Sequence, residues 1–181
     1  PGIRGPELTR PRHRHLRFGA LLFLLLLHAP DVYPGVHARV VAVHDGDTLT
    51  VLVERRQVKV RLTEIDAPEL KQAYGARSKQ SLSELCFGKT AELEMHDRDR
   101  YGRTLAQVYC GGIDANAEQV RRGYAWTYTR YAAPGSPLFA IEREARIARR
   151  GLWEDPTPTP PWDWRRNRRH AALPSPAAAI R

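Results

Sequence analysis

The stretch RLTEIDAPEL, residues 61–70, contains several charged side chains at what its pattern otherwise predicts to be the end of a β-strand. Its charged residues are Arg61, Glu64, Asp66 and Glu69. A second acidic turn, HDGD at residues 44–47, contributes Asp45 and Asp47. Crowded carboxylates repel one another and resist ionising together unless a cation joins them. If the fold brings the two turns together, they predict a site for a hard, oxygen-seeking cation such as Ca²⁺ or Mg²⁺.

The acidic turn at residues 44–47 has a simpler interpretation as well. Asp-Gly sequences mostly mark ordinary tight turns. The stretch also lacks the later ligands and the terminal Glu that a helix–loop–helix calcium site requires. A cation site at this turn therefore depends on acids from elsewhere in the chain.

Two arginines extend the prediction from a cation to a phosphate. Arg61 lies on a predicted strand five residues before Asp66, and Arg103 lies at a turn that enters a later strand. A planar guanidinium binds two phosphate oxygens at once, which suits the charge that grows on a phosphoryl group during attack. Each arginine alone is better explained as a surface strand residue. Acids for a metal, an acid for a base and two arginines together favour phosphodiester hydrolysis.

The elements that must position these residues follow from hydrophobic periodicity. An Asp-Gly turn between β-branched runs predicts a hairpin over residues 38–53, and alternation predicts a third strand over residues 57–65. Two further strands are expected at residues 90–96 and 103–110, and helices at 74–86, 114–123 and 137–153. Five strands with a helix between the third and the fourth predict an OB-type barrel, an α+β fold. Neighbouring strands of its meander can bring both acidic turns to one end.

Four motifs, in this order and at these separations, carry a resemblance to a known family. They are HDGDTLTV (44–51), RLTEIDAPE (61–69), DRYGRTLAQV (99–108) and EQVRRGYAW (118–126). Together they resemble the staphylococcal nuclease, or thermonuclease, family over about residues 38–154. The resemblance implies a five-stranded OB-fold β-barrel with three helices, bound Ca²⁺, and cleavage of DNA and RNA to leave 3′-phosphate ends. It also implies a monomer with no stable protein partner.

The resemblance assigns roles to individual residues. It makes Asp47, Asp66 and the main-chain carbonyl of Ala67 the metal ligands. Catalytic roles fall to Glu69, as the general base for the attacking water, and to Arg61 and Arg103, which would hold the phosphate. Asp45 would support the ligands, and Tyr131 would face the nucleotide. Thr129 departs from the family, because a tyrosine is usual at its position.

Charge and composition divide the chain into three parts. The net charge of +9 is distributed as +3 in residues 1–37, +3 in residues 38–154 and +3 in residues 155–181. Because two thirds of the excess positive charge lies in the two terminal segments, the net charge by itself is weak support for a nucleic-acid partner. The last segment is rich in Pro, Ala and Arg without periodicity, which predicts a disordered tail. Trp162 and Trp164 within it could dock back on the domain.

The first segment has the layout of an export signal. Four arginines precede the apolar run FGALLFLLLL at residues 18–27, which is shorter than the ~20 residues that span a bilayer. Cleavage after residues 27–29 or 36–38, retention as a membrane anchor, and a buried core helix all remain open. An exported chain would be secreted or periplasmic. In such an oxidising compartment Cys86 and Cys110 are either a disulfide or two free buried thiols.

Two functions other than hydrolysis fit parts of the sequence. A noncatalytic OB module that binds nucleic acid would share the barrel and the basic surface. It would not need Glu69, two aspartates and two arginines together. A structural calcium-binding domain of the cell envelope would explain the acids but would leave Arg61 and Arg103 without a task.

Overall fold

The computed structural model describes residue 2 and residues 35–172. The predicted export segment therefore lies almost entirely outside the described residues. Within those residues, no helix is long and apolar enough to cross a membrane.

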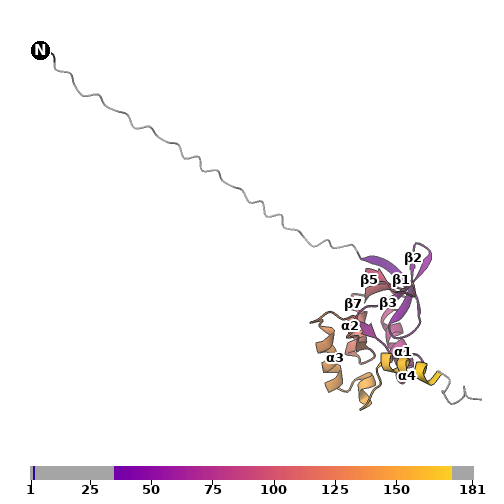
Figure 1. Ribbon diagram of the computed structural model, residues 1–181. Helices are drawn as coiled ribbons and strands as arrows, with labels where there is room; N and C mark the ends of the chain where they lie inside the picture. Colours follow the sequence, from indigo (N-terminus) through magenta and orange to yellow (C-terminus); the bar gives the residue numbers. More distant parts are fainter. Residues whose placement is uncertain (1, 3–34, 173–181) are drawn as a thin grey trace, which may run out of the picture. The chain divides into compact units, whose positions relative to one another are not determined.

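Five long strands form a closed barrel, coloured from indigo to magenta in Figure 1. They are β1 (Val36–Val43), β2 (Thr48–Val53), β3 (Arg56–Leu62), β5 (Thr90–Arg98) and β6 (Thr104–Cys110). Antiparallel pairs run in the order β3-β2-β1-β5-β6, and a parallel pairing of β3 with β6 closes the ring. A short strand, β7 (Ile113–Asp114), pairs antiparallel with the end of β6. The predicted five-stranded OB-type barrel is confirmed.

Alternation along the strands builds the barrel interior. Leu49 and Val51 on β2 and Val60 and Leu62 on β3 are completely buried. Successive strand residues point to opposite faces, so apolar residues two apart share the inner face. The registers of the β1–β2 and β5–β6 pairs shift once each, as a β-bulge does. Such shifts increase the local twist that closing a small barrel requires.

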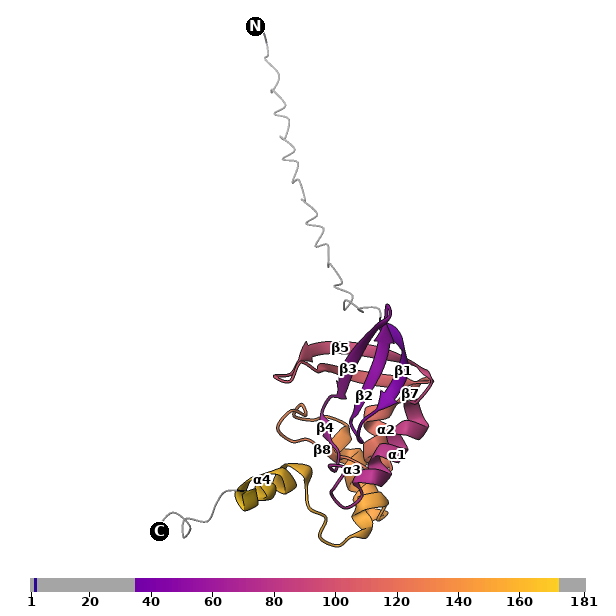
Figure 2. The same ribbon diagram turned by 90° about the vertical axis from the view of Figure 1, so that its right-hand side faces the viewer.

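Four helices occur in the described part of the chain, one more than predicted. They are α1 (Gly75–Cys86), α2 (Ala115–Arg121), α3 (Leu138–Ile147) and α4 (Pro161–Ala172). Figure 2 shows α1, α2 and α3 gathered at one end of the barrel. The predicted Asp cap is present, because the Asp114 side chain accepts a hydrogen bond from Ala117 N at 3.0 Å.

The third helix is shorter than its apolar stripe indicated. It was expected to run to residue 153, but it ends at Ile147, and a 3₁₀ turn follows over Gly151–Glu154. Gly151 has a φ of 55° and packs so tightly that an added Cβ would lie 2.4 Å from Gly123 O. The chain turns at this close approach, and the turn buries Leu152 and Trp153. Burying the Trp153 side chain is therefore favoured over continuing the helix.

The two cysteines form a disulfide between the end of α1 and the end of β6. Cys86 and Cys110 are separated by 24 residues in sequence and are both buried. Of the two alternatives that the sequence left open, the structure contains the bonded pair. Closing a loop of this size removes conformational freedom from the unfolded chain and stabilises the fold by roughly 3 kcal/mol.

The described part of the carboxy-terminal segment, up to residue 172, differs from the expected disordered tail. Residues Pro161–Ala172 form α4, with Pro161 as its first residue, Asp163 in its first turn and Arg169 and His170 in its last. These are favourable positions for proline, for an acid and for basic side chains. Trp162 stacks on Tyr128, with ring centroids 5.4 Å apart and an interplanar angle of 2°. The expected docking of Trp162 is therefore what gives this segment a fixed place.

Candidate functional site

Two turns meet beside the barrel mouth and carry the predicted site. The chain between β1 and β2 holds Asp45 and Asp47, and Asp47 O accepts a hydrogen bond from Leu62 N at 2.8 Å. Directly after β3, the short strand β4 (Ile65–Asp66) pairs with β8 (Trp126–Thr127). The end of β3 is thus tied to the first turn and β4 to the segment after α2, so the acids of both turns converge as predicted.

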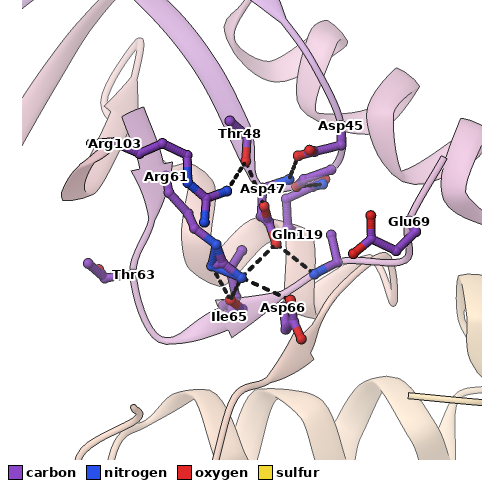
Figure 3. Close-up of polar contacts among 12 residues, drawn as sticks. Asp45, Asp47, Thr48, Arg61, Thr63, Ile65, Asp66, Glu69, Arg103 and Gln119 are labelled. Carbon is purple, nitrogen blue, oxygen red and sulfur yellow. Dashed lines mark hydrogen bonds and ion pairs between the residues drawn. The ribbon is translucent and has the colours of Figure 1, made fainter. Parts of the chain in front are cut away.

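Arg61 lies between the two predicted metal-binding aspartates. Its Nη2 is 3.2 Å from Asp47 Oδ2 and 2.9 Å from Asp66 Oδ1, and it also donates to Ile65 O (Figure 3). Only 5% of Asp47 and 1% of Asp66 is exposed. Burial opposes the charged guanidinium, but the charges of Asp47 and Asp66 outweigh it and raise the pKa of Arg61. Arg61 is therefore a fixed, permanently charged group.

The third predicted ligand residue, Ala67, adjoins the same carboxylate. Its backbone N–H donates to Asp47 Oδ2 at 2.9 Å, while the Thr48 hydroxyl donates to Asp47 Oδ1, also at 2.9 Å. Both oxygens of Asp47 are therefore held in place. The structure brings Asp47, Asp66 and Ala67 together, although their part in metal binding stays a prediction.

The aspartates of this cluster resist ionising together. Burial and then the charge of Asp47 raise the pKa of Asp45 to about 7, and Asp45 also accepts a hydrogen bond from Asp47 N. Burial likewise raises the pKa of Asp66. In the described residues, no three His, Cys, Asp or Glu side chains are arranged to hold a metal ion. The predicted set needs only two such side chains and a carbonyl, and its oxygen donors suit Ca²⁺.

Glu69 lies at the edge of the cluster, where solvent reaches it. Its side chain is 41% exposed, whereas those of Asp47 and Asp66 are almost covered. Arg165 on α4 donates to Glu69 Oε1 at 2.8 Å and also contacts both oxygens of Asp66, at 2.6 and 3.2 Å. Sequence analysis did not find Arg165, because it lies in the segment that was expected to be disordered.

Arg103 lies on the other side of the cluster. Its Nε donates to Asp99 at 2.7 Å, and its Nη1 is 3.5 Å from the hydroxyl of Thr48 (Figure 3). Burial opposes ionisation of Asp99, but hydrogen bonds from Arg103 and Tyr101 lower its pKa overall. The β5–β6 hairpin therefore holds one edge of the Arg103 guanidinium. The guanidinium stays close to the hydroxyl of Thr48, which donates to Asp47.

The cluster opens into a groove with a basic and aromatic rim. Its lining includes the acids, Arg61 and Arg103, and the rim residues are Lys59, Arg98, Arg100, Tyr101, Arg130, Tyr131, Trp162, Arg165, Arg166 and Arg169. Tyr131 is 65% exposed and lies edge to face with Tyr128. A groove with acids in its floor and cations along its rim matches a polyanion that is held by its phosphates over a bound cation.

Glu64 does not join the other acids of the first motif. Its carboxylate accepts hydrogen bonds from Ala133 N at 3.0 Å and from the Ser136 hydroxyl at 2.8 Å. Its backbone carbonyl accepts from Tyr128 N at 2.7 Å. Glu64 therefore fixes the aromatic loop that borders the groove.

Gln119 is a positioning residue that sequence analysis missed, although the motif EQVRRGYAW contains it. Its side chain is completely buried, and its Nε2 donates to Gly46 O at 2.7 Å and to Ser78 O at 3.1 Å. It thereby ties α2 and α1 to the turn that carries Asp45 and Asp47. Nothing in the local sequence distinguishes this glutamine from one on a solvated helix face.

Gly46 offers a test of how strictly that turn is placed. A Cβ at this position would lie 1.7 Å from Ser78 Oγ and 2.8 Å from Ala67 Cβ. Gly46→Ala should push the turn away from α1 and lower any activity of the site by roughly tenfold or more, since small misplacements are costly. Gly46→Ala/Ser78→Ala, which removes the nearest atom, should recover part of the loss. Equal activity of wild type and Gly46→Ala in a cleavage assay would show that the turn tolerates displacement.

Comparison with known proteins assigns the chain to one family. The structure combines an OB-type barrel with a basic groove that holds buried aspartates, a partly exposed glutamate and two arginines. The family described as "Staphylococcal nuclease homologue" matches residues 59–155. The chain belongs to the staphylococcal nuclease family.

Relatives cover most of the chain. An uncharacterized endonuclease of Escherichia coli O157:H7 is 45% identical over 146 residues, which span 80% of this chain and 94% of that protein. A micrococcal nuclease of Shigella flexneri is 40% identical over 166 residues, or 86% of this chain and 95% of that protein. An uncharacterized endonuclease of Haemophilus influenzae is 45% identical over 130 residues, 71% of this chain and 72% of that protein.

Proposed function

We propose that the protein is a calcium-dependent, sugar-nonspecific endonuclease that hydrolyses DNA and RNA to products with 3′-phosphate ends. Family membership and the names of the relatives support the broader part, a nucleic-acid endonuclease. The observation that carries the proposal is the arrangement of Asp47 and Asp66 on Arg61, with the accessible Glu69 beside them in a basic groove.

In this proposal Asp47, Asp66 and the carbonyl of Ala67 would hold Ca²⁺. When bound, the ion would supply positive charge beside the scissile phosphate. Oxygen donors favour Ca²⁺ and Mg²⁺ alike, so the preference for calcium rests on the family resemblance. The hydrogen bonds from Ala67 N and Thr48 to Asp47 orient that carboxylate.

Glu69 would act as the general base. It is the accessible carboxylate of the cluster, so a water molecule can lie beside it in the groove. As the water oxygen bonds to phosphorus, its proton passes to Glu69, and the bond from phosphorus to the 5′ oxygen breaks. The leaving oxygen takes up a proton and becomes a 5′-hydroxyl, while the phosphate stays on the 3′ side. A positioned general base typically contributes roughly 10²–10⁴-fold to the rate.

Arg61 and Arg103 would stabilise the charge that grows on the phosphate oxygens. Arg103 is held by Asp99, so its guanidinium does not have to be ordered during the reaction, whereas Arg61 is paired with the two buried aspartates. For Arg61, contact with a phosphate would require the pairing with Asp47 and Asp66 to loosen when these bind a cation.

The rim of the groove supports binding without regard to sugar or sequence. Tyr101 and Tyr131 are exposed aromatic platforms, and every base has a face that can stack on them. Phosphate contacts from arginines carry no sequence information. Because recognition by stacking and charge does not require a particular sugar, these side chains support the proposal that both DNA and RNA are substrates.

We also propose that the protein works as a monomer outside the cytoplasm. The disulfide between Cys86 and Cys110 supports an oxidising compartment, since such bonds are rare in the reducing cytosol. Secretion or residence in the periplasm, with the amino-terminal segment either removed or kept as an anchor, would provide that compartment.

The chemistry of the product ends tests the proposal. End-labelled single-stranded DNA, duplex DNA and RNA are each incubated with the protein and calcium. We expect all three to be cut, and the 3′ ends to resist extension by a polymerase until a phosphatase removes the phosphate. Products that are extended without phosphatase would contradict attack with departure of the 5′ oxygen.

A further inference from the structure

Helix α4 is held against the domain by contacts that do not involve its arginines. Trp162 stacks on Tyr128 and meets Trp126 edge to face, with centroids 6.5 Å apart. Just before the helix, Gln72 Nε2 donates to Thr159 O at 2.5 Å. Aromatic pairs in these geometries are stabilising beyond the area that they bury. These contacts do not depend on the partners of the basic side chains of the helix.

One face of α4 borders the groove. The groove-lining residues of the helix are Trp162, Arg165, Arg166 and Arg169, at relative positions i, i+3, i+4 and i+7. This spacing places them on a single stripe of a helix. Arg168 is also exposed but lies off that stripe. Figure 2 shows α4 next to the β4 and β8 region, in agreement with the contact of Trp162 with Trp126 on β8.

Arg165 is paired with the very carboxylates that the proposed reaction uses. It contacts both oxygens of Asp66 and one oxygen of Glu69. A cation that binds Asp66 must therefore share or replace this guanidinium. Arg165 can leave more easily than Arg61, because 37% of its side chain is exposed against 13% for Arg61.

A phosphate in the groove is the natural new partner for a released Arg165. Arg166 and Arg169 line the groove beside it, so its new position would already be one of positive potential. The fork of a guanidinium matches a phosphate as well as it matches a carboxylate. Before a phosphate binds, the ion pairs of Arg165 screen the charges of Asp66 and Glu69, which would otherwise repel a polyanion.

We propose that the groove-facing stripe of α4 is a wall of the nucleic-acid-binding surface, and that Arg165 binds a substrate phosphate once a cation displaces it from Asp66. This inference rests on the proposed function of the site. It assigns to the carboxy-terminal helix a part in substrate binding that the barrel motifs do not provide.

The first test measures calcium binding without nucleic acid, by calorimetry on the full chain. Arg165→Gln is compared with Arg168→Gln, which removes the same charge from the same helix away from the groove. Because Arg165 competes for Asp66, Arg165→Gln should bind calcium about tenfold more tightly, the size of effect expected for a charge-assisted contact. Arg168→Gln should stay within about twofold of wild type, since exposed charges have small effects. Equal dissociation constants for the two variants would overturn the displacement.

The second test measures single-stranded DNA binding with calcium in a Glu69→Gln background. Adding Arg165→Gln should weaken binding several-fold and lower the slope of log K against log salt by about 0.7, the value for one phosphate contact on a single strand. Adding Arg168→Gln should leave that slope nearly unchanged. Identical slopes would overturn the role of Arg165, and circular dichroism of each variant confirms that α4 is retained.

The outcomes also separate this inference from the proposed function. A wild-type protein that never cuts, but whose DNA binding depends on Arg165 and not on Arg168, would overturn the nuclease proposal and support the binding wall. A wild-type protein that cuts, with the same salt slope in both variants, would overturn the binding wall alone.

Discussion

Replacing Glu69 with glutamine should lower kcat for phosphodiester cleavage by roughly 10²–10⁴-fold, the usual contribution of a general base. Glutamine keeps the size of the side chain but cannot accept the proton of the attacking water. Glu69 is partly exposed and lies outside the hydrophobic core, so the fold should stay intact. Single-turnover cleavage of a labelled DNA strand at saturating protein measures the chemical step without the contribution of substrate binding.

The matched control for this experiment is Glu144→Gln. Glu144 is an exposed glutamate on α3, so its substitution removes the same charge away from the groove. It should cut at the wild-type rate. Near-wild-type turnover in Glu69→Gln, with both variants folded, would remove Glu69 from the mechanism.

Replacing Arg103 with lysine should lower kcat by roughly 10²-fold, as the loss of one transition-state donor does. Lysine keeps the charge, but a point charge cannot give a phosphate two parallel hydrogen bonds while it also holds Asp99. Asp99 accepts from the Nε of Arg103 and fixes the direction of the guanidinium, and a lysine in its place has a single nitrogen to share. Comparison of kcat with KM distinguishes the loss of transition-state contacts from weaker binding.

The control for Arg103→Lys is Arg39→Lys, since Arg39 is an exposed arginine on β1 that does not line the groove. Its kcat and KM should be unchanged. If Arg103→Lys retained full kcat, a positive charge alone would suffice at this position, and the proposed bidentate contact would be wrong.

The barrel and the meeting of the two acidic turns could be predicted, because both follow from local patterns. Alternating residues such as Val58, Val60 and Leu62 define a strand face whatever surrounds it. An antiparallel meander then places successive turns at its ends. The proximity of Asp47 and Asp66 could therefore be predicted from the strand topology alone.

The remaining features depend on contacts between distant segments. Docking of Trp162 was expected, but its partner Tyr128 lies in a distant segment, so the helix that this stacking positions was missed. Arg165 and Gln119 act across about a hundred and about seventy positions of sequence, respectively, so no spacing rule could link them to the site. Glu64 and Glu69 are both glutamates, but the Glu64 carboxylate accepts a hydrogen bond from Ala133 N and does not join the other acids. Glu64 also differs in its backbone, which has a positive φ.

Calcium dependence of cleavage in the full chain tests the central claim most directly. Labelled DNA is incubated with the protein in calcium, in excess chelator, and in chelator followed by excess calcium, alongside folded Asp66→Asn protein. We predict cutting with calcium, none with chelator, recovery when calcium returns, and none in Asp66→Asn. Cutting that continues in chelator, or wild-type protein that binds calcium and DNA but leaves the strand whole, would contradict the assignment of these carboxylates to a calcium-dependent catalytic site.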